Sequence, residues 1–290
     1  MKMKTKAVIS VCLVIFTFTG VLSGQDQATN SAEKVIASII KQTGSSPVIN
    51  TVDVIKAGNP QTTVTGIVTT MFATMDVLKE AVALNCNLII SHEPVFYNHR
   101  DETSQFKNDP VFLEKKRFID DHKLVIWRFH DYIHRLKPDA IDYGMALRLG
   151  WLKYIDGDVT ERFLIPETTL KELLAYLKNV FPGNTFNVVG DQDMKLTRIV
   201  FSAGAPGSDS HFTLLEDNDT DVILAGEVPQ WETYEYVRDA VSQGRKKAII
   251  FLGHVTSEEP GMEYCSTWLK GFISNIPIHF VASRPSYWTF

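Results

Sequence analysis

Hydrophobic residues between positions 31 and 150 follow two patterns that alternate along the chain. Apolar residues spaced three and four apart, each set preceded by a capping residue or begun by a proline, predict helices over 31–41, 74–84, 110–121 and 138–150. Short apolar or β-branched runs predict strands over 63–70, 87–91 and 124–129. Such alternation is typical of mostly parallel strands with helices packed on the faces of the sheet.

The second half of the chain continues this alternation. Strand patterns occupy 163–166, 186–189, 196–201, 221–225, 248–252 and 278–282. Helical patterns begin after Thr168 or Thr169 and cover 231–242 and 259–273. We therefore predict an α/β fold of mostly parallel or mixed sheets with flanking helices. A change of pattern near 150–162 indicates a middle subdomain over 151–244, inserted into a lobe formed by 25–150 and 245–290.

Residues 1–24 have the pattern of a secretory signal. Lys2, Lys4 and Lys6 precede the apolar run 7–18, and the small residues at 23 and 24 lead into a polar segment. The run is shorter than the roughly 20 residues that a spanning helix needs, so we expect cleavage after Gly24 and no stable membrane anchor. The sequence thus predicts an exported protein, either periplasmic or secreted.

Composition narrows the possible partners. The chain has 290 residues, of which 44% are hydrophobic, and a net charge of −5. Removal of residues 1–24 takes away three lysines and no acid, which makes the net charge −8. An acidic chain with scattered basic residues argues against nucleic acid as a partner. Cys86 and Cys265 remain after cleavage; pairing in an oxidising compartment is open, but free thiols are expected because the surroundings of Cys86 resemble a buried site.

Histidines and carboxylates follow three of the predicted strands. The strand 87–91 leads into His92-Glu93, the strand 124–129 into His130 and His134, and the strand 248–252 into His254 and Glu258. Because ligands of open α/β sheets lie beyond the carboxyl ends of the strands, these side chains are expected at one edge. Imidazole and carboxylate together are suited to divalent metals. Each motif alone is also explained by polar residues on an ordinary protein surface. The remaining histidines do not follow strands together with carboxylates in this way: His122 is expected in a loop, His211 on an exposed helix face and His279 in the final strand.

The order of these motifs resembles a known family. His92-x-Pro94-x-Phe96, His130-x-x-x-His134, the LAGEV segment at 224–228 and His254-x-x-x-Glu258-x-x-Gly261 are similar to motifs of the dinuclear-metal-centre hexameric proteins. These proteins are relatives of the NGG-one-interacting factor three and are also labelled type-two GTP cyclohydrolase homologues. The resemblance covers about 52–282 and implies two interwoven α/β lobes, two divalent ions per chain (Zn, Mn or Fe) and a homo-hexamer.

Two positions depart from the family pattern. His92, His130, His254 and Glu258 match it directly, whereas Glu93 stands where the family has histidine and His134 where it has a bridging aspartate. The exchange is reciprocal, so the formal charge of the six residues is unchanged. We interpret it as a compensated two-metal site with Glu93 or Glu258 as the bridge. The alternative is that His134 is a lost ligand and one ion is retained.

The resemblance favours a dinuclear metal-dependent hydrolase that acts on a small phosphorylated, nucleotide or amide compound. The catalytic residues are unknown; His99 and Arg100 are candidates for holding an anion or donating a proton. A glycine-rich turn before a helix offers candidate anion-binding residues, namely Gly204, Gly207 and Ser208. Glu227 resembles the family's Gly-Glu pair, or is an acid favoured at a helix N-terminus. A non-catalytic metal-binding or storage assembly and a protein-interaction module are the alternative functions.

Overall fold

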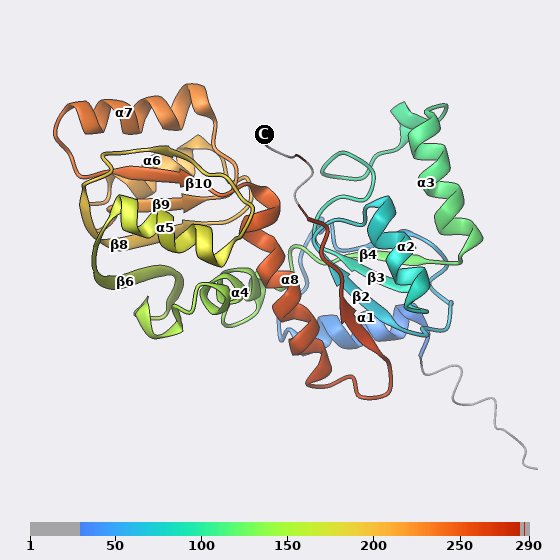
Figure 1. Ribbon diagram of the computed structural model, residues 1–290. Coiled ribbons are helices and arrows are strands. Elements are labelled where there is room, and N and C mark those ends of the chain that lie inside the picture. The colour runs from blue at the N-terminus through green and yellow to red at the C-terminus, as the bar shows by residue number, and fades with distance from the viewer. Residues whose placement is uncertain (1–29, 285–286, 288–290) are drawn as a thin grey trace, which may run out of the picture.

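The computed structural model describes residues 30–284 and Tyr287, which form two lobes, each built on one mixed β-sheet (Figure 1). The predicted signal segment 1–24 lies outside these residues. Helices flank both sheets, so the predicted α/β class is confirmed. Within the described part of the chain, no helix is long and apolar enough to cross a bilayer.

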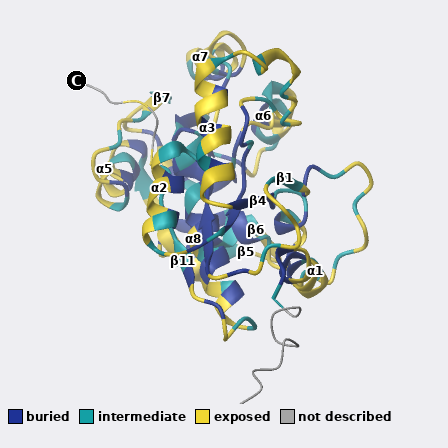
Figure 2. Cartoon of the chain, turned by 90° about the vertical axis from the view of Figure 1, so that its right-hand side faces the viewer, coloured by how far each residue is buried: buried dark blue, intermediate teal, exposed yellow. Residues whose placement is uncertain are grey.

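The first sheet has the strand order β1-β4-β3-β2-β11. Its strands β2, β3, β4 and β11 are parallel, and β1 pairs antiparallel at one edge. The strands are β1 (Ile55–Ala57), β2 (Ile67–Thr70), β3 (Leu88–Ser91), β4 (Val125–Arg128) and β11 (Ile278–Phe280). Every residue of β2, β3 and β4 is buried because both faces of the sheet are covered. The nearly all-apolar run 87–91 predicts this for β3, and Figure 2 shows it for β4.

Different helices cover the two faces of this sheet. One face packs on α1 (Ala32–Gln42) and α8 (His254–Lys270), through residues such as Ile39 and Met262. The other packs on α2 (Met75–Ala83) and α3 (Pro110–Asp121), through residues such as Leu78 and Ile119. Cys265 belongs to the first of these cores and Cys86 to the second, and both are buried free thiols, as expected.

The second sheet has the strand order β5-β6-β8-β9-β10-β7, with β8, β9 and β10 parallel. The strands are β5 (Ile155–Asp156), β6 (Val159–Thr169), β7 (Asn187–Val189), β8 (Lys195–Ser202), β9 (Val222–Ala225) and β10 (Ala248–Phe251). One face packs on α4 (Ala140–Arg148) and α5 (Leu170–Val180), and the other on α6 (Ser208–Glu216) and α7 (Glu235–Ser242). Short helical turns complete the chain at Ser104–Phe106, Ile133–Arg135, Leu152–Tyr154 and Gln230–Tyr234.

The return from the second sheet to the first comes later in the chain than the sequence indicates. We expected residues 245–290 to rejoin the first lobe, but β10 pairs with β9 and β7 in the second sheet. The chain passes to the first lobe through α8 and β11. The expected helix 259–273 begins five residues earlier, at His254, ends at Lys270, and contains Pro260 in its interior.

Helices α4 and α8 pack closely between the two sheets (Figure 1). A Cβ atom placed on Gly144 of α4 would lie 2.5 Å from the Cα of Gly261 of α8. Only glycine at both positions permits this approach of the two backbones. The N-terminal end of α8 is thereby fixed where the two lobes meet.

Candidate metal centre

The carboxyl ends of neighbouring strands deliver the first part of the centre. His92 and Glu93 follow β3, and His130 follows the adjacent parallel strand β4. The loop after β4 is held by the buried carboxylate of Asp53, which accepts hydrogen bonds from the backbone N–H groups of His130, Asp131 and Tyr132 at 2.8–2.9 Å. His134 lies on the helical turn Ile133–Arg135 that comes next.

The first turn of α8 delivers the second part. His254 is the first residue of this helix and Glu258 lies one turn further on, so the two side chains share a face. The Nε2 atom of His254 is 3.0 Å from the Oε2 atom of Glu258 and 3.5 Å from the Oε1 atom of Glu93. Gly204 makes room for Glu258, because a Cβ atom at Gly204 would lie 2.3 Å from its Oε1 atom.

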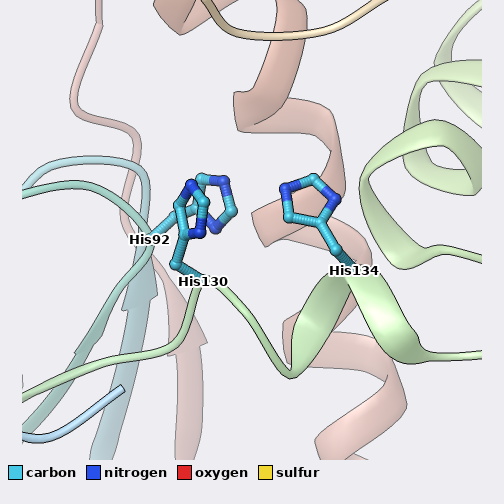
Figure 3. A group of neighbouring side chains, drawn as sticks. All are labelled: His92, His130 and His134. Carbon is cyan, nitrogen blue, oxygen red and sulfur yellow. The ribbon is translucent and has the colours of Figure 1, made fainter. Parts of the chain in front are cut away.

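The structure brings all six of the predicted ligands together. The ligand atoms of His92, His130 and His134 lie within 4.8 Å of one another, as do those of His92, Glu93 and Glu258. The rings of His92 and His130 are stacked with centroids 4.7 Å apart, and the His134 ring faces them from the opposite side (Figure 3). Such a group of histidines and carboxylates could bind a metal ion.

Each of the four imidazoles is held through its Nδ1 atom. His92 donates to the carbonyl oxygen of Phe129 at 3.1 Å, and the other three donate to carboxylates. These pairs are His130 with Asp131 at 3.1 Å, His134 with Asp139 at 2.9 Å, and His254 with Glu227 at 2.8 Å. Because carbonyl and carboxylate oxygens accept hydrogen bonds only, the neutral form of each ring has its proton on Nδ1 and its lone pair on Nε2, the tautomer that binds a metal.

Several nitrogen and oxygen atoms that face the interior of the centre lack hydrogen bonds. Among the described residues, the Nε2 atoms of His92 and His254 and the Oε2 atom of Glu258 are buried and lack a hydrogen bond of good geometry, although His254 Nε2 and Glu258 Oε2 lie 3.0 Å apart. Buried polar atoms are otherwise almost always satisfied, since an unpaired one costs free energy. A cation between these atoms would satisfy all three, so the residues fit a divalent metal.

When no metal is bound, protonated imidazole balances the negative charge of the carboxylates in the centre. Burial opposes ionisation of Glu258, yet the imidazoles of His92 and His254 hold the pKa of its carboxyl well below the usual range. Burial also opposes charge on His254, but Glu258, Glu93 and Glu227 raise its pKa to about 11. Burial and the neighbouring His92 lower the pKa of His130 to about 4. Burial opposes charge on His134 as well, but Asp139 and Glu258 raise its pKa to about 9. The metal-free centre therefore carries imidazolium groups at His254 and His134 beside the two carboxylates.

The structure adds one residue that sequence reasoning missed, the fully buried Arg128 at the end of β4. Its Nη2 atom lies 3.2 Å from the Oε2 atom of Glu93, and its Nε atom donates to the carbonyl oxygen of His92 at 3.1 Å. Its Nη1 atom donates to the carbonyl oxygen of His99. An arginine in an otherwise apolar strand is the signal that could have identified it, because a buried charge needs partners.

Two pockets border the centre. One of about 580 Å³ is lined by side chains including Phe72, Glu227, Phe251, His254 and Tyr287. The other, of about 1120 Å³, is lined by side chains including Glu93, Tyr97, His99, Lys115 and Arg284. The pockets share Phe72 and Val255, so they meet beside the centre. Their size suits a small molecule.

The other candidate site residues, His99, Arg100 and those of the glycine-rich turn, differ in whether they line a pocket. His99 is exposed and lines the larger pocket, with its ring centroid 6.2 Å from that of His130. Arg100 is also exposed but, of the described residues, is not among those that line either pocket. In the glycine-rich turn, the Gly204 N–H donates to Ser257 and the Ser208 hydroxyl donates to Glu232. Of the three candidate anion-binding residues in this turn, Gly207 lines the smaller pocket.

One expectation about the other histidines is wrong. His211 was expected on an exposed face of its helix, but it is fully buried, with Nδ1 3.3 Å from the hydroxyl of Thr233. The turn Gln230–Tyr234, a π-helical segment that sequence periodicity does not reveal, covers it. His279 lies in β11, as predicted, and His122 ends α3 as its C-cap.

The fold and the centre together define a two-lobed α/β protein with a histidine–carboxylate group at the meeting point of the lobes. The chain belongs to the Duf34/NIF3 (NGG1p interacting factor 3) family, whose model matches residues 51–115 and 156–286. A protein of Clostridium acetobutylicum named GTP cyclohydrolase 1 type 2 homolog is 27% identical over 235 residues, which is 77% of this chain and 82% of that protein.

Solved structures share the fold. The hypothetical protein SA1388 of Staphylococcus aureus aligns with a TM-score of 0.70 and 16% identity, covering 90% of this chain and 99% of that one. A Bacillus cereus protein related to NIF3 aligns with a TM-score of 0.67 and 14% identity, covering 90% and 98%. Reduced HcgD from Methanocaldococcus jannaschii aligns with a TM-score of 0.60 and 16% identity, covering 86% and 97%.

Proposed function

We propose that the protein is a dinuclear metal-dependent hydrolase that acts on a small phosphorylated, nucleotide or amide compound. The observation that carries the proposal is the set of inward-facing Nε2 and carboxylate oxygen atoms without hydrogen-bond partners, placed beside two pockets of small-molecule size. When bound there, two divalent ions would polarise the scissile group and activate water at neutral pH.

The chain's own residues shape the substrate preference. The six side chains include only two carboxylates, so they neutralise the charge of two divalent ions incompletely, which favours an anionic substrate group such as phosphate. His99, exposed in the larger pocket, is placed to hydrogen bond with a substrate or to donate a proton to a leaving group. Phe72, Phe251 and Val228 give the smaller pocket an apolar wall for the non-reacting part of the substrate.

The test begins with purified protein loaded with Zn²⁺, Mn²⁺ or Fe²⁺ and a panel of phosphate esters, nucleotides including GTP, and amides. We expect metal-dependent turnover of one class, and loss of that turnover in His254→Ala. His122→Ala, which changes an exposed histidine at the end of α3, serves as the matched control. Tight metal binding with no turnover across the panel would favour a metal-binding or storage assembly instead. Capture of a protein partner that chelators do not affect would favour an interaction module.

Location and assembly complete the proposal. We propose that the protein is exported, with cleavage after Gly24, and that it therefore meets its substrate outside the cytoplasm. Amino-terminal sequencing of the secreted or periplasmic protein tests this proposal. A sequence that still begins at Met1 would contradict it. We also propose a homo-hexamer, as the family resemblance implies. Light scattering on the eluting protein would give the mass of six chains, whereas a monomer mass would rule the hexamer out.

A further inference from the structure

The two carboxylates of the centre each lie between imidazoles of different origin. The Oε1 atom of Glu93 is 3.6 Å from Nε2 of His130 and 3.5 Å from Nε2 of His254. The Oε2 atom of Glu258 is 3.4 Å from Nε2 of His92 and 3.0 Å from Nε2 of His254. Both carboxylates thus have His254 on one side and a histidine of the first lobe on the other.

This arrangement separates the imidazoles into two groups. On one side the ligand nitrogen atoms of His92, His130 and His134 lie close enough to share a single ion. Glu93 and Glu258 form a second group with His92, and His254 lies on the far side of these carboxylates, 3.5 Å from Glu93 and 3.0 Å from Glu258. The first position is rich in nitrogen, and the second is rich in oxygen.

The exchange at positions 93 and 134 produces this difference. His134 adds a third imidazole to the first group, whereas Glu93 supplies carboxylate oxygen beside His254 where a histidine would supply nitrogen. The guanidinium of the fully buried Arg128, 3.2 Å from Oε2 of Glu93, holds that carboxylate with its Oε1 atom directed at the two imidazoles. The exchange therefore distributes nitrogen and oxygen ligands unevenly between the two metal positions, while the formal charge of the six residues stays the same.

From this asymmetry we infer that the centre holds two different metals, with Zn²⁺ at the three-imidazole position of His92, His130 and His134 and Mn²⁺ at the carboxylate-rich position of His254, Glu93 and Glu258. Three imidazoles are an established ligand set for zinc, and imidazole favours zinc over manganese strongly. Carboxylate oxygen suits manganese and discriminates less against it. The inference rests on the proposed dinuclear centre but does not depend on hydrolysis.

The experiment uses the purified protein after removal of bound metal by a chelator. One equivalent of Zn²⁺ is added, followed by excess Mn²⁺, and free metal is removed. We expect one zinc and one manganese per chain by elemental analysis, and an electron paramagnetic resonance spectrum of isolated Mn²⁺, because its zinc neighbour is diamagnetic. Anomalous diffraction at the zinc and manganese absorption edges would place zinc between His92, His130 and His134, and manganese beside His254.

A reversed exchange supplies the matched variant. Glu93→His combined with His134→Asp moves nitrogen and oxygen back toward an even distribution, so the first equivalent of zinc should divide between the two positions. His122→Ala should keep the ordering of the unaltered protein. Because diffraction from the unaltered protein decides the metal positions by itself, misfolding of the double variant would leave the test intact.

The results separate this inference from the proposed function. Zinc from the first equivalent at the His254 position, or divided equally between the positions in the unaltered protein, would overturn the inference even if the protein hydrolyses a substrate. Ordered zinc and manganese without turnover of any substrate would support the inference and count against the hydrolase.

Discussion

The carboxylate of Glu227 accepts a hydrogen bond from Nδ1 of His254 at 2.8 Å, and it reaches the centre from the loop that follows β9. A carboxylate in this position fixes the tautomer of the imidazole and raises its basicity. The Gly-Glu pair at 226–227 therefore supports the orientation of a candidate ligand. Four such contacts, one for each histidine, prepare the centre before a metal arrives.

Removal of the Glu227 carboxylate should weaken metal binding without removing a ligand. We expect Glu227→Gln to lower the affinity for Zn²⁺ or Mn²⁺ by roughly 10- to 100-fold, the usual effect of losing such a partner. Calorimetric titration of the metal-free protein measures this. Glu216→Gln, at an exposed position on α6, is the control. Equal affinities for the two variants would show that Glu227 does not support His254.

The ion pair of Arg128 and Glu93 should be strongly coupled. Arg128→Met removes the guanidinium that pairs with the buried Glu93 carboxylate, so we expect a loss of roughly 3–5 kcal/mol in the free energy of unfolding. Adding Glu93→Gln should recover part of that loss, because the unpaired charge is then gone. Urea denaturation of both single variants and the double variant gives the coupling free energy. Additive losses would indicate that the two side chains act independently.

Gly204→Ala should disturb the centre through one carboxylate. The added Cβ would lie 2.3 Å from Oε1 of Glu258, and Gly204 also has a φ of +61°. Gly183→Ala is a matched control, since Gly183 has a φ of +87° and no described atom within 4 Å of its Cβ position. Both variants should lose about 1 kcal/mol of stability through backbone strain. Only Gly204→Ala should also lose bound metal on elemental analysis; equal metal content would contradict the packing argument.

His211 should make the protein sensitive to acid. Burial lowers its pKa below the usual value, so the unfolded chain binds a proton that the folded chain resists. Stability from this group is complete above pH of about 6.5 and falls as pH decreases through that value and below it. We expect His211→Gln, compared with the unaltered protein, to show a shallower decline in the free energy of unfolding between about pH 7 and pH 5. Parallel declines would show that His211 does not contribute.

The sequence identifies elements well where local signals and burial agree. The helix α3 spans Pro110–Asp121 as predicted, because Asp109 caps it and Pro110 begins it. Thr74 caps α2 in the same way, with its hydroxyl accepting from the N–H of Val77 at 3.2 Å. His92, Glu93 and His130 follow the adjacent parallel strands β3 and β4, as the expectation of one sheet edge requires. That expectation is wrong for His254 and Glu258, because β10 belongs to the second sheet and α8 carries both residues to the centre. The role of the six residues as ligands stays a prediction.

What the sequence does not reveal depends on contacts between distant segments. Asp53 is unremarkable in the sequence, yet it holds the loop of His130 from 77 residues away. Asp139 looks like a helix cap, which it is, but its second carboxylate oxygen also accepts from His134. The helix expected over 259–273 begins at His254 instead and contains Pro260, and the tertiary packing that tolerates a proline inside a helix has no local pattern.

The close approach of Gly144 and Gly261 has a consequence for ligand exchange. Because the backbones of α4 and α8 meet without intervening side chains, the lobes have little freedom to swing apart like the halves of a clamshell. Ligand exchange at the centre then depends on the two pockets that border it, and the side chains of Phe72 and Val255 line both. Entry would be paced by rotation of these side chains on a nanosecond scale, not by slow opening of the whole molecule.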